Sequence, residues 1–118
     1  MKLQTFASCK QPTVLAEITP ETWIDEIKNG HSYKFLIDSA REDLDLNGKK
    51  PDGHYCKIKE GSLPTICWNF KFNGYKSSKN AVESTGYLYF DIDNNPSFDI
   101  SLIDKNLVFV FFLSLFII

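Results

Sequence analysis

The sequence predicts an α+β fold, with two N-terminal helices followed by an antiparallel-type sheet. Two observations lead to this prediction. Apolar residues recur at helical spacing in the first third of the chain, whereas from Thr65 onward they alternate with polar residues, as on a half-buried strand. The chain has 118 residues, 43% hydrophobic and 24% charged, which suits one folded domain.

Helix boundary signals are clearest near the start of the chain. Residues 1–18, interrupted by a proline, are predicted to be an extended lead-in, and a single domain is expected over residues 19–118. Thr19 can cap the free N–H groups of a helix, and Pro20 suits its first position. Gly30 is predicted to end this helix.

The middle of the chain alternates between periodic and turn-rich stretches. A second helix is predicted over about 32–42, and a short helical turn over 54–60. Between them, residues 43–53 contain Asn-Gly and Pro-Asp-Gly and are predicted to be a loop. One strand is expected over 65–72, followed by a polar loop over 76–84.

Two carboxylates stand out in the apolar segment 87–93, which reads as a second strand. Asp91 and Asp93 are two positions apart, so on a strand their side chains share one face. Their repulsion is relieved by a divalent cation, and Mg²⁺ prefers such oxygen ligands. The alternative is that Asp93 caps the turn formed by the two asparagines after it, while Asp91 lies on a solvated face.

Overall charge does not indicate a basic nucleic-acid binder, because the formal net charge is −2. Lys71, Lys76 and Lys79, which lie around an aromatic strand, are one candidate for a local basic patch. They are predicted to meet nucleic acid or phosphate groups, the alternative being an ordinary solvated face.

The cysteines predict a reducing compartment. Cys9, Cys56 and Cys67 are odd in number and lack paired spacing, so they are expected to be free thiols in a cytoplasmic protein. A zinc site made by Cys56, Cys67 and His54 is the alternative, although structural zinc takes four ligands.

The segment 107–118 is apolar except for one serine. As a helix it would extend only about 18 Å, against roughly 30 Å of membrane hydrocarbon, so no membrane span is predicted. Its content of Val, Ile and Phe favours a buried strand, and membrane association or aggregation through this tail is the alternative.

Several of these features together resemble one known family. Leu63-Pro64-Thr65-Ile66, then Ser84-Thr85-Gly86 followed by Tyr87-Leu88-Tyr89-Phe90-Asp91-Ile92-Asp93-Asn94, are similar to the VirE-like N-terminal domain of primase–helicase proteins of phages and mobile elements. That domain belongs to the archaeo-eukaryotic primase superfamily. The helical stretch 19–41 and residues 57–64 also resemble it, and the resemblance covers about residues 15–110.

The resemblance implies a palm-like sheet of RRM-like topology and a metal-dependent nucleotidyltransferase, a DNA primase-polymerase. In that family the first two acidic residues bind catalytic Mg²⁺ or Mn²⁺, and these map onto Asp91 and Asp93. The implied partners are a DNA or RNA template, nucleotides and a helicase. The family also needs a Ser/Gly-rich nucleotide-binding strand and a third acidic residue, which this sequence lacks, so we expect an incomplete, truncated domain that is inactive alone.

Two other functions stay open. One is a non-enzymatic module that binds single-stranded nucleic acid or a helicase through the three lysines and nearby aromatic side chains. The other is a small protein with a membrane-associating apolar tail.

Overall fold

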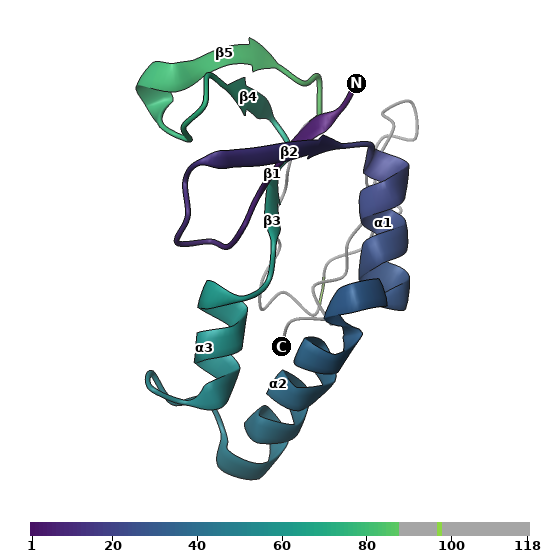
Figure 1. Ribbon diagram of the computed structural model, residues 1–118, viewed down its shortest axis with the longest axis vertical. Coiled ribbons are helices and arrows are strands. Elements are labelled where there is room, and N and C mark those ends of the chain that lie inside the picture. Colours follow the sequence, from purple (N-terminus) through teal and green to yellow (C-terminus); the bar gives the residue numbers. More distant parts are fainter. Residues whose placement is uncertain (88–96, 98–118) are drawn as a thin grey trace. The chain divides into compact units, whose positions relative to one another are not determined.

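The structure, a computed structural model, describes residues 1–87 and Ser97. Contacts divide the chain into two units, Met1–Leu88 and Tyr89–Ile118, and the fold below is that of the first. Along the chain, Figure 1 shows β1 (Leu3–Phe6), β2 (Val14–Ile18), α1 (Pro20–Asn29), the 3₁₀ turn η1 (His31–Tyr33), α2 (Lys34–Asn47), α3 (His54–Gly61), β3 (Thr65–Cys67), β4 (Phe70–Phe72), the 3₁₀ turn η2 (Ser78–Asn80) and β5 (Ala81–Ser84).

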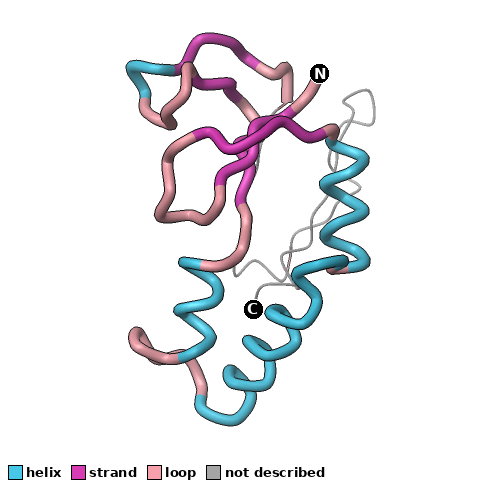
Figure 2. The backbone as a smooth tube through the Cα atoms, viewed as in Figure 1, coloured by secondary structure: helices cyan, strands magenta, loops and turns pink. Residues whose placement is uncertain are grey.

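The α+β class is confirmed, and the predicted order of elements is partly wrong. Two strands precede the helices, so the chain does not begin with a helical pair. The stretch expected to be an extended lead-in forms β1 and β2. The strands make a three-stranded sheet in the order β2-β1-β3 and a two-stranded sheet β4-β5, both antiparallel (Figure 2).

The central strand β1 escaped prediction because its sequence, Leu-Gln-Thr-Phe, does not alternate between apolar and polar residues. All four side chains are nevertheless buried, with Leu3 and Phe6 almost completely so. The two polar ones are hydrogen-bonded: Gln4 to the backbone of Phe72, and the Thr5 hydroxyl to the Ala16 carbonyl oxygen at 3.3 Å. Satisfying these groups removes most of the penalty of burying them.

Helix α1 begins and ends where the local signals predict. The Thr19 hydroxyl oxygen accepts a hydrogen bond from the N–H of Thr22 at 3.2 Å, and Pro20 occupies the first turn. Gly30 terminates the helix with φ 71°, and its N–H donates to the carbonyl oxygen of Glu26 at 2.8 Å. A residue with a Cβ is disfavoured in this left-handed conformation, which explains the glycine.

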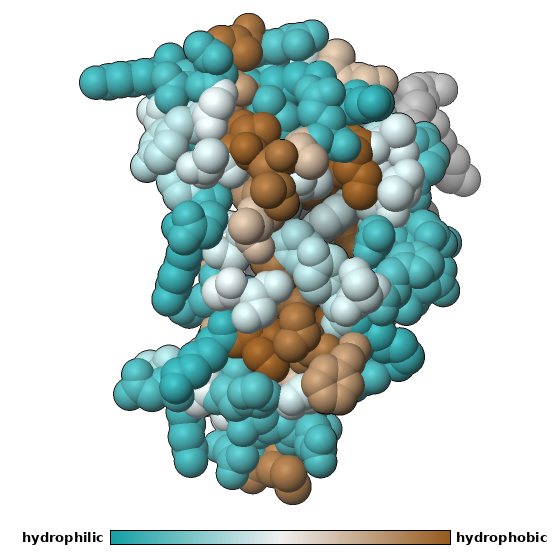
Figure 3. All heavy atoms as spheres, in the orientation of Figure 1, coloured by the Kyte–Doolittle hydropathy of each residue, from teal (hydrophilic) through white to brown (hydrophobic). Residues whose placement is uncertain are grey.

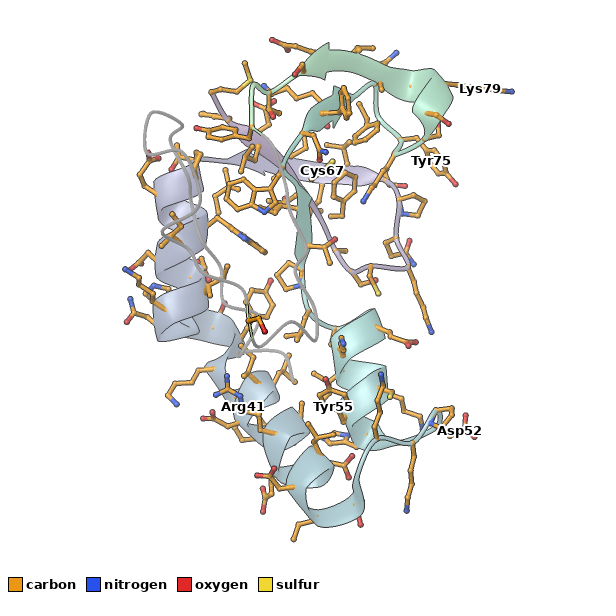
Figure 4. The ribbon with its side chains drawn as sticks, turned by 180° about the vertical axis from the view of Figure 1, so that it is seen from behind. Arg41, Asp52, Tyr55, Cys67, Tyr75 and Lys79 are labelled. Carbon is orange, nitrogen blue, oxygen red and sulfur yellow. The ribbon has the colours of Figure 1, made fainter. Side chains whose placement is uncertain are left out.

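Helices α2 and α3 pack against each other around a small core. Helix α2 extends five residues beyond the predicted end at residue 42, so the loop expected from residue 43 is shorter than predicted. The predicted helical turn over 54–60 is confirmed as α3. Tyr55 lies between the two helices in Figure 4. The buried residues of this core are Ala40, Tyr55, Cys56 and Ile58, and Leu36, Leu44 and Leu63 pack against them.

The single strand predicted over 65–72 is wrong, because the structure divides it into β3 and β4 in different sheets. Strand β3 pairs with β1, whereas β4 pairs with β5. The predicted loop over 76–84 is also partly wrong, since its last four residues form β5. All four side chains of β5 are exposed, so no apolar alternation marks it as a strand.

On the face drawn in Figure 3, apolar side chains gather along the middle and hydrophilic ones flank them. Several large apolar side chains of the described residues remain well exposed, namely Leu15, Phe35, Leu46, Tyr75 and Val82. Of the strand predicted over 87–93 only Tyr87 is described, and the strand predicted over 107–118 lies outside the described residues. The palm-like sheet of RRM-like topology depends on them and stays a prediction.

Candidate functional site

The predicted metal ligands Asp91 and Asp93 lie outside the described residues. The structure does describe the segment that leads to them, up to Tyr87. The geometry available for the site is therefore that of this approach segment and of the predicted lysines.

Thr85 fastens the approach segment to the connection between β3 and β4. Its side chain is 5% exposed, and its N–H donates to the Asn69 carbonyl oxygen at 2.9 Å. Its hydroxyl donates to the carbonyl oxygen of Trp68 and accepts from the N–H of Tyr87, the latter at 3.3 Å. The rings of Trp68 and Tyr87 meet edge to face, with centroids 5.9 Å apart. Three contacts thus hold residues 85–87 against the β3–β4 connection, and the fourth is internal to the segment that leads to the carboxylate pair.

Two of the three predicted lysines already have partners inside the fold. The Lys71 ammonium lies 3.1 Å from Glu17 Oε1 on β2, and its side chain is only 18% exposed. The Lys76 ammonium lies 5.5 Å from the ring centroid of the buried Phe6. The charge of Lys71 is therefore largely neutralised. The aliphatic part of Lys76 covers the core, while its charged end faces solvent.

The third lysine, Lys79, belongs to η2 at the tip of the β4–β5 hairpin. Its side chain extends away from the ribbon in Figure 4, at the same end of the hairpin as Tyr75. Among the described residues it forms no ion pair. Lys79 therefore has its charge available to an external anion, as does the exposed Lys76, whereas Lys71 is paired with Glu17.

Tyr75 was not singled out by the sequence, and the structure holds its backbone firmly. It forms an isolated antiparallel bridge with Thr13. On either side, the Lys76 N–H donates to the Pro12 carbonyl oxygen at 2.7 Å, and the Val14 N–H donates to the Gly74 carbonyl oxygen at 3.0 Å. The side chain is nevertheless 50% exposed. An aromatic ring on an anchored backbone can bind a flat ligand at little cost in conformational entropy.

The alternative zinc site is not formed by the described residues. They contain no group of three or more His, Cys, Asp or Glu side chains able to hold a metal ion. His54 instead makes a 2.8 Å hydrogen bond with the hydroxyl of Ser39, and Cys56 is buried in the α2–α3 core. Cys9, Cys56 and Cys67 are free thiols.

The fold defines an α+β domain with an aromatic and basic hairpin. No helix within residues 1–87 has the length and apolar character needed to cross a membrane. Comparison with known proteins finds no match to a protein-family model, a curated protein or a solved structure.

Proposed function

We propose that this chain is the N-terminal part of a primase-polymerase-like domain that serves nucleotidyl transfer in the replication of phage or mobile-element DNA. The observation that carries the proposal is the Asp91-Ile92-Asp93 sequence directly after an apolar segment. Two carboxylates on one face of a strand supply the oxygen ligands that Mg²⁺ or Mn²⁺ takes. When bound, such an ion neutralises phosphate charge during phosphoryl transfer.

The described residues support this proposal by what they do for the carboxylate segment. Thr85, with Trp68 and Tyr87, gives the segment a fixed starting point. An anchored start to the segment reduces the conformational entropy that is lost when a cation orders the two ligands. Free thiols are consistent with work in the cytoplasm beside a template, nucleotides and a helicase.

The test measures cation binding and not catalysis, because the resemblance assigns other residues needed for catalysis to later parts of the domain. Mn²⁺ is titrated into the wild-type chain and into the double variant Asp91→Asn/Asp93→Asn, with binding followed by water proton relaxation. Asp52→Asn is the matched control, since Asp52 is an exposed loop carboxylate far along the chain. We expect binding by the wild type and the control and its loss in the double variant. Equal binding by all three folded proteins would reject the metal site.

A second candidate function is favoured by the tip of the β4–β5 hairpin. The exposed ring of Tyr75 and the ammonium of Lys79, which forms no ion pair within residues 1–87, lie at the same end of it. We propose that Tyr75 and Lys79 contact single-stranded nucleic acid without any need for metal. Stacking of one base on an aromatic side chain contributes about 1–3 kcal/mol, and one phosphate contact changes the salt slope of log K by about 0.7 on single strands.

Binding of a labelled oligonucleotide in the presence of EDTA separates the two functions. We expect Tyr75→Ala to weaken binding at every salt concentration and Lys79→Gln to reduce the salt dependence. Lys49→Gln, in the exposed loop after α2, is the control and should leave binding unchanged. If binding is absent at low salt, or is the same in all variants, the proposed contact of the hairpin with nucleic acid is wrong. That result would not bear on the proposed metal site.

A further inference from the structure

The corner between α1 and α2 contains two successive residues with positive φ. Gly30 has φ 71°, which costs a glycine little, but His31 follows with φ 34°. A residue with a side chain rarely adopts this region unless other contacts hold it there. The backbone at His31 is therefore slightly strained, and side-chain contacts must stabilise this conformation.

The offsetting contact is an ion pair that folds His31 back onto α1. Its Nε2 lies 2.6 Å from Asp25 Oδ2, and the other oxygen of Asp25 accepts from the Asn29 side-chain amide at 2.6 Å. His31 lies between the C-terminal end of α1, where the helix dipole favours a positive charge, and the start of η1 and α2, where the dipole opposes it. The contact with the Asp25 carboxylate is therefore the feature that stabilises the imidazolium more than the neutral ring.

The charges around the corner act in the same direction. The hydrogen bond that His31 donates to Asp25 raises the pKa of His31 above its ordinary value of 6.5, against a smaller opposing effect of burial, and Glu26 adds to the rise. Lys28 acts on Asp25 and helps to keep that carboxylate ionised. On the α2 side, Lys34 is already paired with Asp38 at 2.8 Å.

The geometry points to a pH-sensitive joint between α1 and α2, in which protonated His31 bound to Asp25 holds the corner in its positive-φ conformation. When the imidazole loses its proton, the ion pair is lost and only a weaker hydrogen bond from the neutral ring to the Asp25 carboxylate remains, while the backbone strain is unchanged. The corner is then free to relax, and the angle between the two helices changes with it. This joint is independent of the function proposed above.

The direction of the pH dependence follows from the raised pKa of His31. The ion pair contributes fully below about pH 6.5 and its contribution is lost as the pH rises through the higher pKa of the folded state. For an exposed pair, we expect opening of the corner to become about two- to fivefold more frequent across that range.

A pH titration of the full chain by NMR tests the joint. We expect the backbone signals of Gly30 and Tyr33 to shift with the same midpoint as the His31 imidazole, and amide exchange there, corrected for its intrinsic pH dependence, to accelerate by that factor. His31→Asn tolerates positive φ and cannot carry the charge, so it should abolish both effects, as should Asp25→Asn. His54→Asn is the control histidine variant and should retain them.

Two results would overturn the proposal. One is a corner whose backbone signals stay constant while the His31 ring titrates. The other is an unchanged pH response in His31→Asn, which would assign the response to another group.

Discussion

The side-chain amide of Gln4 pairs with both backbone polar groups of Phe72. Its Nε2 donates to the Phe72 carbonyl oxygen at 3.0 Å, and its Oε1 accepts from the Phe72 N–H at 2.7 Å. Gln4 is on β1 and Phe72 is on β4, so a side chain performs the pairing that a neighbouring strand would otherwise supply. The rings of Phe6 and Phe72 also meet edge to face between β1 and β4, with centroids 6.4 Å apart.

Replacing this amide with a hydrocarbon should loosen the two sheets from each other. Gln4→Leu keeps the approximate volume but leaves the N–H and carbonyl of Phe72 without this partner in a site where Gln4 is only 8% exposed. We expect the free energy of unfolding to fall by about 2–4 kcal/mol, measured by urea denaturation. The exposed Gln11→Leu is the control. A loss below about 0.5 kcal/mol would mean that water replaces the amide.

Helices and strands whose bounds are set by residues in or next to the element itself were predictable from the sequence. Thr19, Pro20 and Gly30 each act on the helix that contains or adjoins them, and the observed bounds of α1 agree with them. The period change at Thr65 likewise marks real strands, although not where one sheet ends and the other begins.

Features that depend on distant partners were not predictable in this way. Gln4 is polar, and only its bond to a residue 68 positions away makes it a core residue. Strand β5 exposes all its side chains and exists because its backbone pairs with β4. At the candidate site, the grouping of Lys71, Lys76 and Lys79 was visible, but the partner of Lys71 on β2 was not.

Gly30 offers a direct test of the α1–α2 corner. A Cβ added there would lie 3.0 Å from the Lys34 Cβ and 3.1 Å from its Cα, in a residue whose φ is already 71°. We expect Gly30→Ala to lower the free energy of unfolding by about 1–2 kcal/mol. Gly61→Ala, in α3 with open space around it, should instead be neutral or stabilise by up to about 1 kcal/mol. Equal effects of the two substitutions would refute this account of the corner.

Asp43 makes the α2–α3 pair sensitive to acid. Its Oδ2 accepts from the N–H of Tyr55 at 2.9 Å, capping α3, and Asn47 donates to the other oxygen. The Tyr55 N–H, and after it the Asn47 amide, hold the pKa of Asp43 below its ordinary value of 3.8. The cap is thus fully formed above about pH 3.8, and its contribution is lost as the pH falls through the lower pKa of the folded state.

The matching experiment compares thermal unfolding of the wild type and Asp43→Asn between pH 7 and pH 2. We expect the variant to be less stable at pH 7 and the difference to shrink below pH 3.8, because the amide cannot lose a charge. Asp52→Asn, at an exposed loop position, serves as the control. A difference that stays constant over this range would assign the acid sensitivity to other carboxylates.

Thr85 provides the last prediction, because it anchors the chain six positions before the first proposed metal ligand, Asp91. Thr85→Val preserves shape and burial but removes the hydroxyl that donates to Trp68 and accepts from Tyr87. We expect a loss of about 1–2 kcal/mol in the free energy of unfolding. Thr13→Val, on the exposed side of the loop between β1 and β2, should change little. If the carboxylate pair binds Mn²⁺ and depends on this anchor, Thr85→Val should also weaken that binding while the protein remains folded. Unchanged affinity in a destabilised variant would limit Thr85 to a structural role, because the ligands would then hold their geometry without it.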